Sequence, residues 1–356
     1  MRYCVMQLTP CCYPMPKCSI KRSFTLLSLA KTMFLLKKSV KLIIFSLICT
    51  FSGVYCYAQS EPQFAAAYAI PTALNPAAAG RAGQFEATAA FRKQWLGFTD
   101  EPSNLLLTID KEIALLKNFH GVGAVVLQDK AGPPTMLDMA LNYSYHIYLA
   151  DGLLGLGLRL GARNVKYDAS SLYTAVSGLS DDYHQESDQA ITSLDDSQTA
   201  FDVGLGAFYQ TQRSFVSLAF LHLTSPELEF KNGALFKVRP VVTLSSGILL
   251  GHNIKDKAFE PRLSMRSDFA SLQLDMTLNV NIRQKVWFGL GYRLQDALLI
   301  GAGLRLPIGL DIAYNYDLSL SSLKRYNTGA HEVVLRYLFD LDTQRATKNY
   351  KSVRIL

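Results

Sequence analysis

The sequence predicts an all-β protein, a transmembrane antiparallel β-barrel of the outer membrane with about 14 strands. Three observations predict this fold. Apolar and polar residues alternate over unusually long segments, charged residues fall on the polar side of those segments, and a leader typical of exported proteins comes first. After Gln59, no uninterrupted apolar stretch is long enough for a membrane-spanning helix.

The first 58 residues differ in composition from the rest of the chain. They hold eight Lys or Arg residues, no acidic residue and all six cysteines, so the remaining 298 residues (356 − 58) carry 28 bases (36 − 8) against 29 acids. This net charge of −1 gives no support for nucleic-acid binding through a positive field. Without cysteines, the part after the leader can form no disulfide, thiolate zinc site or catalytic thiol.

A secretory signal peptide is predicted within this leader. A basic segment, an apolar run and two small residues precede Gln59 in the order typical of such signals. Cleavage is expected between Ala58 and Gln59, and Met33 is expected to be the true start because residues 1–32 do not suit a signal peptide. The alternative is an N-terminal anchor helix, although the apolar run is short for a membrane span. The signal features are Lys37, Lys38, Lys41, residues 42–54, Cys56 and Ala58.

Strand length and polarity distinguish a membrane barrel from a soluble sandwich. Segments 137–149 and 272–282 alternate strictly, which gives each one apolar and one polar face. Sandwich strands are commonly about five or six residues long, whereas strands that cross a membrane need about nine to eleven. Charges on the polar face would be costly in a dry core but fit a polar lumen. The residues expected to face inward include Arg159, Arg163, Asp202, Asp275, Asn279, Arg293, Arg305, Asp311, Asn315 and Arg336.

The strand pattern divides the chain into regions. Residues 1–58 are the leader, and residues 59–82, with three prolines and no strand pattern, are expected to form an extended segment or a plug. Residues 83–339 form the barrel and 340–356 a tail. The expected strands are 84–94, 103–111, 120–129, 136–149, 153–167, 200–210, 214–223, 238–251, 259–268, 271–283, 285–294, 297–306, 308–317 and 331–339.

The connections predict an orientation for the barrel. Short turns are expected in the periplasm and longer links outside, with both termini periplasmic because the strand number is even. The long link 168–199 is rich in Asp and Glu and has no Lys or Arg. It is interpreted as a solvated loop, with a divalent cation or a basic partner surface as the alternatives. The longest links are 168–199, 224–237 and 318–330.

Several spaced motifs occur in order along the chain. They are Gln63-Phe64-x3-Tyr68-x2-Pro71-x3-Asn75-Pro76-Ala77-x2-Gly80, Arg92-x-Gln94-Trp95-x-Gly97-Phe98, Asp129-Lys130-x-Gly132-Pro133, Asp202-x-Gly204-x-Gly206-x2-Tyr209, Trp287-x-Gly289-x-Gly291-Tyr292-Arg293 and Tyr326-Asn327-x-Gly329-x-His331-Glu332. Single motifs of this kind are weak signals, but their order and spacing are specific. Over residues 61–339 the chain resembles the PorP/SprF family, outer-membrane proteins of the Bacteroidetes type IX secretion system and its gliding-motility branch.

The resemblance implies a function in protein secretion. Such a barrel would support the export or surface anchoring of specific secreted or adhesin substrates and link them to periplasmic machinery. Its implied partners are periplasmic ring or peptidoglycan-linking components of the type IX system and a substrate with a C-terminal signal domain, besides the lipid bilayer. A porin-like diffusion channel for small solutes is the alternative. No cofactor and no nucleic-acid partner are implied.

Polar and aromatic residues near strand ends and in the lumen are candidate contacts for loops or partners. Arg92 is a candidate partner of Asp129. Trp95 fits either an aromatic girdle or a side chain that pins the first loop over the lumen, and His222 and His331 are expected to bond to loop residues. The candidates are Arg92, Trp95, Asp129, Lys130, Asp202, His222, Arg293, Asp296, Tyr326, Asn327 and His331.

No catalytic or metal site is expected. The histidines are scattered without the helical spacing of a zinc site, and no Ser–His–Asp set is evident. Glycine pairs such as Gly155-Leu-Gly157 fall on the inward face of predicted strands, where a missing side chain makes room in the lumen. A nucleotide-binding loop would instead need a strand–turn–helix context. The sequence therefore predicts a protein that is not an enzyme.

Overall fold

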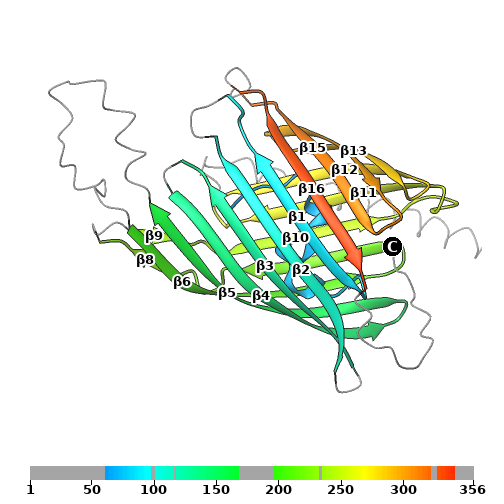
Figure 1. The fold of residues 1–356 in the computed structure, drawn as a ribbon, viewed down its shortest axis with the longest axis horizontal. Helices are drawn as coiled ribbons and strands as arrows, with labels where there is room; N and C mark the ends of the chain where they lie inside the picture. The colour runs from blue at the N-terminus through cyan, green and yellow to red at the C-terminus, as the bar shows by residue number, and fades with distance from the viewer. Residues whose placement is uncertain are drawn as a thin grey trace, which may run out of the picture. The chain divides into compact units, whose positions relative to one another are not determined.

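Fourteen antiparallel strands close into one barrel, in which consecutive barrel strands pair and β1 pairs with β16 (Figure 1). The computed structural model describes residues 61–97, 101–115, 118–132, 134–167, 196–231, 235–321 and 327–340. Among these residues, no helix is long and apolar enough to cross a membrane.

The barrel strands have these bounds: β1 (Phe85–Lys93), β2 (Ser103–Leu115), β3 (Asn118–Lys130), β4 (Pro134–Leu149), β5 (Gly152–Tyr167), β6 (Asp196–Gln210), β7 (Ser214–Leu221), β10 (Val241–Ile248), β11 (Lys257–Ser267), β12 (Leu272–Ile282), β13 (Val286–Arg293), β14 (Ala297–Arg305), β15 (Leu310–Ser319) and β16 (Ala330–Phe339). Two short strands, β8 (Glu227–Glu229) and β9 (Leu235–Lys237), form a separate hairpin.

The predicted fold is confirmed, because each of the fourteen expected strands is present with its ends shifted by a few residues. The prediction missed the hairpin of β8 and β9 inside the link 224–237. Each of its strands has only 3 residues, which leaves no alternation long enough to recognise. Several predicted features lie outside the described residues, namely Met33, Ala58, Gln59, most of the acidic link 168–199, Tyr326 and the tail after residue 340.

The two ends of the barrel carry different connections. We call one end the loop end, and its connections are 94–102, 131–133, 168–195, 222–240, 268–271, 294–296 and 320–329. The opposite end is the turn end. It holds the start of β1, the end of β16 and the connections 116–117, 150–151, 211–213, 249–256, 283–285 and 306–309.

Strand length divides the barrel into a tall wall and a low wall. The tall wall is β2–β6, with strands of 13 to 16 residues. The low wall is β7, β10–β16 and β1, with strands of 8 to 11 residues. A membrane crossing needs about nine to eleven residues, so only the tall wall extends beyond the bilayer.

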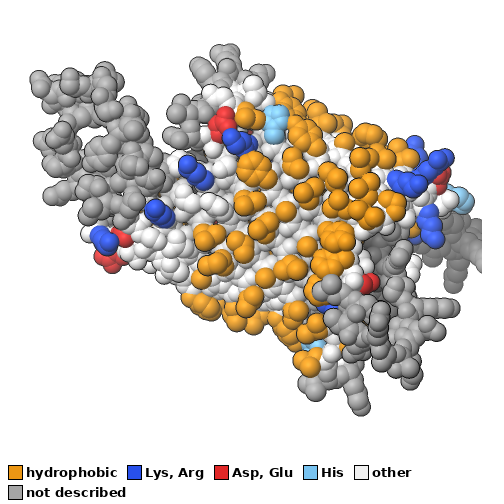
Figure 2. All heavy atoms as spheres, viewed as in Figure 1, with side chains coloured by type: hydrophobic (Ala, Val, Ile, Leu, Met, Phe, Trp, Pro, Cys, Tyr) orange, Lys and Arg blue, Asp and Glu red, His pale blue; other side chains and the backbone are white. Residues whose placement is uncertain are grey.

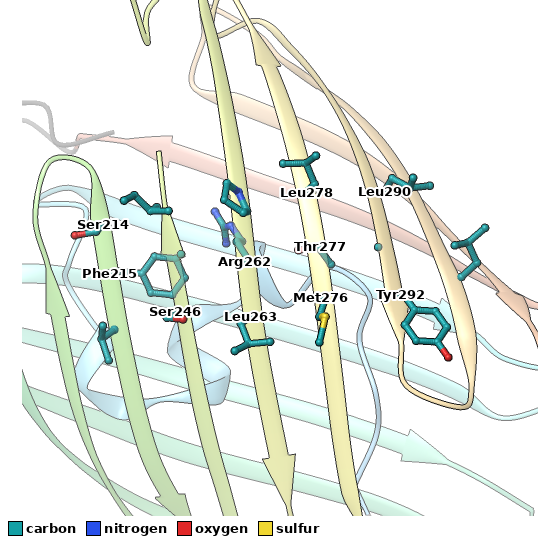
Figure 3. Close-up of a pocket in the computed structure, with 16 residues that line it drawn as sticks. Ser214, Phe215, Ser246, Arg262, Leu263, Met276, Thr277, Leu278, Leu290 and Tyr292 are labelled. Atoms are coloured by element: carbon teal, nitrogen blue, oxygen red, sulfur yellow. The ribbon is translucent and has the colours of Figure 1, made fainter. Parts of the chain in front are cut away.

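The outer surface is an apolar band, as a lipid-facing barrel requires. Figure 2 shows hydrophobic side chains spread over this face, and Figure 3 shows Leu263, Met276 and Tyr292 on neighbouring strands of the low wall. On β5 the exposed apolar residues end at Leu160, and Lys166 is exposed further along the strand. Strand β5 therefore leaves the bilayer at the loop end.

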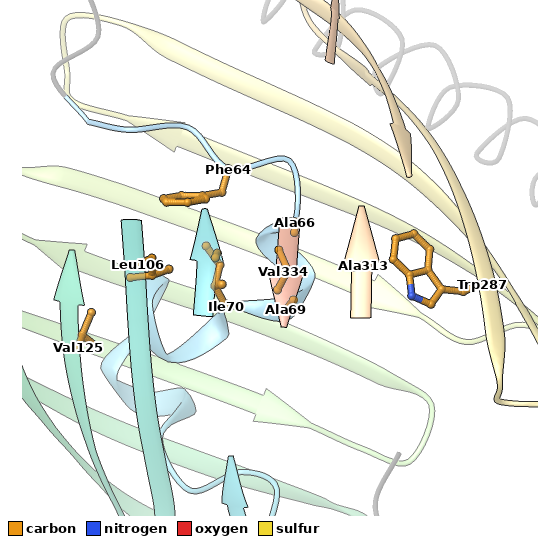
Figure 4. Packing of buried hydrophobic residues seen from close by; sticks show 10 residues of the cluster. Phe64, Ala66, Ala69, Ile70, Leu106, Val125, Trp287, Ala313 and Val334 are labelled. Carbon is orange, nitrogen blue, oxygen red and sulfur yellow. The ribbon is translucent and has the colours of Figure 1, made fainter. Parts of the chain in front are cut away.

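Residues 61–84, which we call the plug, lie inside the barrel. They include η2 (Ala67–Ala69), α2 (Pro71–Leu74) and η3 (Pro76–Ala78). Apolar plug residues pack on inward side chains of both walls, and Tyr68 meets Trp287 edge-on with ring centroids 5.0 Å apart. The shared core, seen in Figure 4, contains Phe64, Ala66, Ala69, Ile70, Ala90, Leu106, Val125, Trp287, Ala313 and Val334.

The plug runs from the loop end to the turn end. Its first described residue, Glu61, contacts Arg163 and His222, which lie near the loop-end limits of β5 and β7. Close to its last residue, Arg81 lies 3.5 Å from Glu86 at the turn-end start of β1. The chain thus passes through the lumen before the first strand begins.

Candidate functional site: the plug and the loop end

Side chains of the barrel wall satisfy the backbone of the plug. On the low wall, the Glu332 carboxylate accepts hydrogen bonds from the N–H groups of Ala65 and Ala66 at 2.8 and 2.7 Å. On the tall wall, inward side chains bond to plug carbonyl groups. Because an unpaired buried backbone group is costly, these bonds fix the path of the plug. The tall-wall pairs are Asn142 with Thr72, Arg159 with Ala73, Ser144 with Ala77 and His146 with Ala79.

Asn75 fastens the middle of the plug. Its side-chain oxygen accepts a hydrogen bond from Ala77 N at 2.9 Å, which caps η3. Its side-chain amide donates to Ser217 Oγ at 2.8 Å and to the Ala207 carbonyl at 3.0 Å. This one side chain therefore shapes η3 and also joins it to β6 and β7.

Two inward glycines allow η3 to approach the tall wall. A Cβ atom at Gly157 would lie 2.1 Å from the backbone nitrogen of Ala77, and one at Gly206 would lie 2.0 Å from Asn75 Oδ1. No side chain fits in those gaps. The inward glycines do make room in the lumen, and the plug occupies that room.

Arg92 belongs to a buried charge network on the low wall. Its guanidinium lies 2.7 Å from Asp317 and 3.3 Å from Glu332. Arg293 contacts the same Asp317 at 3.0 Å and also Asp275 at 3.0 Å. Both arginines are at most 2% exposed, so each charge depends on its partners rather than on water. The network ends at Glu332, which holds the plug.

The pairing of Arg92 with Asp129 considered from the sequence is wrong. Asn104 of β2 lies between them in the cross-strand register, and its amide donates to Asp129 Oδ1 at 2.6 Å. Arg92 instead contacts carboxylates of β15 and β16. Two strand spacings separate Arg92 from Asp129, which is too far for a direct ion pair.

A second charge cluster holds the start of the plug at the loop end. Glu61 lies 2.7 Å from Arg163 and 3.2 Å from His222. Arg163 also contacts Asp138 at 2.6 Å, and His222 Nδ1 lies 2.9 Å from Asp202. These contacts bring the candidates His222 and Asp202 together with a plug residue that was not a candidate.

The charged groups in this cluster shift the pKa values of one another. Burial alone would raise the pKa of Glu61, but Arg163 and His222 hold that pKa well below its usual range. Burial would lower the pKa of His222, but Glu61 and Asp202 raise it to about 9. At neutral pH the first carboxylate of the plug is thus an anion between two cations.

The first and last loops form one rim at the loop end. Leu96 N donates to the Gly329 carbonyl at 3.2 Å, and Thr328 N donates to the Leu96 carbonyl at 3.0 Å. Trp95 is half-buried beside this joint, with a positive φ of 55°. Asn327 Oδ1 accepts a hydrogen bond from Gly329 N at 2.8 Å. The candidates Trp95 and Asn327 therefore lie together at the rim.

The remaining candidates make other contacts. His331 shares the outer face with Tyr314, and its Nδ1 lies 2.5 Å from the Tyr314 hydroxyl, so this expected loop contact is wrong. Lys130 is exposed at the end of β3, and Asp296 lies 3.5 Å from Arg293. Within the described ranges, no group of three His, Cys, Asp or Glu side chains is arranged to hold a metal ion.

The part of the tall wall beyond the bilayer forms a lip at the loop end. We define the lip as residues 134–138, 163–167 and 196–200 with the hairpin of β8 and β9. Val165 of β5 packs with Leu228 and Phe230, and the rings of Tyr167 and Phe230 meet at 4.9 Å and 89°. The hairpin therefore covers the inward side of the lip, which would otherwise expose apolar side chains to water.

Sequence reasoning missed the residues that hold the plug, namely Glu61, Asn75 and Glu332. Each carried a signal. Glu61 is the only acidic residue in segment 59–82, which leads into a lumen lined by arginines. Asn75 and Glu332 stood in spaced motifs but were not chosen as contacts. A polar residue in an apolar segment and an inward carboxylate are the features that could have identified them.

A closed barrel with an apolar outer band and a charged lumen defines the class: this is an outer-membrane β-barrel protein. The family model "Type IX secretion system membrane protein PorP/SprF" matches residues 56–337. The chain belongs to the PorP/SprF family, a membrane component of the type IX secretion system, as its motifs indicated. Among curated proteins, no match is found.

Solved outer-membrane proteins are similar at low identity. The "CymD monoaromatic hydrocarbon channel" is 11% identical, covers 77% of this chain and 93% of that chain, and has a TM-score of 0.45. The Ralstonia pickettii toluene transporter TbuX is 11% identical, with coverages of 74% and 91% and a TM-score of 0.43. The Acinetobacter baumannii outer membrane protein Omp33 is 9% identical, with coverages of 72% and 98% and a TM-score of 0.38. Likeness at this level carries no argument about function.

Proposed function

We propose that this barrel supports the export or surface anchoring of a specific secreted or adhesin-like substrate by the type IX system. The loop end and its lip hold the C-terminal signal domain of that substrate. The turn end and the tail contact periplasmic ring or peptidoglycan-linking components. The proposal includes no chemical step and no cofactor.

The plug is the observation that supports this proposal over a diffusion channel. A wide barrel conducts solutes only if a continuous aqueous path crosses it. Here the plug is bonded to both walls between Glu61 and Arg81. A cavity beside Glu61 and Arg159 measures about 40 Å³, which is room for a few water molecules. A substrate at the loop end would therefore meet a surface rather than an open pore.

Affinity purification of the tagged barrel from detergent-solubilised outer membranes tests this function. We expect type IX ring components and a large secreted protein to co-purify. Leu235 on the lip is 67% exposed, so Leu235→Glu should reduce recovery of the secreted protein without affecting the ring components. The matched variant Asp151→Lys, at an exposed turn-end position, should leave the secreted protein bound.

A conductance measurement in planar bilayers tests the alternative function, a diffusion channel. Recovery of the barrel alone, together with steady conductance of the unmodified protein, would overturn the docking proposal and favour a porin. Equal loss of the secreted protein in Leu235→Glu and Asp151→Lys would leave secretion intact as a function but reject the lip as the docking surface.

A further inference from the structure

We propose that the outer face of the low wall binds one phospholipid with an anionic headgroup. Its acyl chain would lie in a groove over β10–β14, and its phosphate would contact Lys and Arg side chains of the adjoining turns. This site is independent of the docking function proposed for the loop end, because it faces the bilayer and its charged end adjoins the turn end.

The groove is a depression of about 690 Å³ on the lipid-facing surface. Its sides are outward apolar residues of neighbouring strands, including Leu263, Met276 and Leu290 (Figure 3). Between them lie the small side chains of Ser246 and Pro261.

Pro261 explains why the wall is hollowed at this point. The ladder between β10 and β11 stops at the pair Gly247–Arg262 and resumes as a single bridge between Leu250 and Phe259. In the same register, Pro261 would face Ile248, but proline has no N–H group to donate. Two pairs of the ladder are therefore absent, and the short side chains of Ser246 and Pro261 line the groove beside this gap.

Basic residues gather where the groove approaches the turn end. Connections 211–213 and 283–285 and residues 249–257 carry five Lys or Arg residues and one acid, Asp256. Figure 2 shows blue side chains grouped beyond the edge of the apolar band. By contrast, turns 150–151 and 306–309 at the same end carry no Lys or Arg. The basic residues, all exposed, are Arg213, Lys255, Lys257, Arg283 and Lys285.

Backbone bonds hold these turns side by side as one surface. Leu249 N donates to the Arg213 carbonyl at 2.6 Å, and Arg283 N donates to the Asp256 carbonyl at 2.6 Å. The chain connects this surface directly to the groove, because Ser214 and Ile248 line the groove and adjoin the turns. The apolar groove can hold an acyl chain, and the Lys and Arg side chains at its end can bind the phosphate of the same lipid.

The membrane supplies the occupant. The groove opens among outward residues of membrane-crossing strands, so acyl chains rather than water reach it. Short turns are expected on the periplasmic side of such barrels, where the leaflet is made of phospholipid. Each Lys or Arg near the headgroups strengthens binding of an anionic lipid by about fivefold.

Native mass spectrometry of the full mature barrel in detergent tests the site. The protein is mixed with equal amounts of phosphatidylglycerol and phosphatidylcholine that carry the same acyl chains. We expect phosphatidylglycerol to be retained at least about fivefold more. Arg283→Glu with Lys285→Glu should remove that preference, whereas Ser246→Phe should fill the groove and reduce retention of both lipids.

Matched controls separate this site from general charge effects. Lys93→Glu with Lys130→Glu makes the same charge change at the loop end and should leave the lipid preference unchanged. Excess inorganic phosphate should not displace phosphatidylglycerol, because the acyl chain provides part of the binding. Heat-dependent gel migration verifies that each variant is folded. Equal retention of the two lipids by the unmodified barrel, or an unchanged preference in the Arg283/Lys285 variant, would overturn the proposal.

Discussion

The tall wall and the low wall hold the same plug by different means. The low wall offers a carboxylate, Glu332, to plug N–H groups and supports it with Arg92. The tall wall offers donors to plug carbonyl groups and lets η3 approach closely at Gly157. The plug is therefore fixed through its backbone, whose N–H and C=O groups are satisfied largely on opposite sides of the barrel.

The walls also differ in strand length and in the environment that their outward residues face. Strands of the low wall have 8 to 11 residues, close to the length of a bilayer crossing, so their alternation separates lipid from lumen along their whole length. Strands β4, β5 and β6 of the tall wall continue into the lip, where outward positions such as Asn164 and Lys166 are polar and Val165 is buried under the hairpin. The same period-two alternation thus continues from the bilayer into water, while the outward residues change from apolar to polar.

The largest loss of stability is expected when Arg92 is removed from the low-wall charge network. Arg92→Ala leaves Glu332 and Asp317 buried with fewer positive partners, and breaking such a buried network costs about 3–5 kcal/mol. The measurement is the free energy of unfolding in urea with the barrel in lipid vesicles. The matched variant is the next residue, Lys93→Ala, which breaks an exposed pair with Glu101 at 3.2 Å and should cost about 0–1 kcal/mol. Equal losses would contradict the network's role.

A methyl group at Gly157 tests the tall-wall side. Gly157→Ala places its Cβ 2.1 Å from Ala77 N, so η3 must move, and overpacking of this kind costs about 1–3 kcal/mol. We expect the variant to be less stable, and we expect it to conduct ions in planar bilayers because the plug is displaced. The control is Gly204→Ala, whose Cβ would meet Leu221 Cδ2 at 2.8 Å, an atom at the end of a flexible side chain. If both variants conduct alike, close packing at Gly157 does not seat the plug.

The second charge cluster, which holds Glu61 and His222, should make the seating of the plug sensitive to pH. The folded pKa of His222, about 9, lies above its ordinary value of 6.5, so protonation stabilises the plugged state. That stabilisation is complete below about pH 6.5 and is lost as pH rises through about 9, at up to about 1.4 kcal/mol for each pH unit. Unfolding free energies measured from pH 6 to pH 10 should show this slope. His222→Gln should flatten it, and a slope that survives would assign it to another group.

The sequence predicts the wall well because each strand's pattern is local. Segment 272–282, for example, alternates in the sequence and forms β12 between Leu272 and Ile282. The plug contacts could not be predicted in this way, since Ala66 and Glu332 are 266 positions apart and no period relates them. The choice of candidate residues from the sequence was wrong where the strand register decides which side chain faces the lumen. His331 and Glu332 are neighbours in one motif, but only Glu332 faces the lumen, because adjacent strand residues point to opposite faces.

The direction of the plug puts its first described residue and the end of the last strand at opposite ends of the barrel. Glu61 is at the loop end and Phe339 at the turn end. If cleavage follows Ala58, the expectation that both termini are periplasmic conflicts with this path.

Single cysteines can decide between the two arrangements with little disturbance, because all six native cysteines precede the expected cleavage site. We expect Ser60→Cys to react with a membrane-impermeant maleimide from the same side as Lys130→Cys, which is exposed at the loop end. Lys285→Cys, exposed at the turn end, should react only from the other side. Labelling of Ser60→Cys together with Lys285→Cys would reverse the plug's direction and remove the contact of Glu61 with His222.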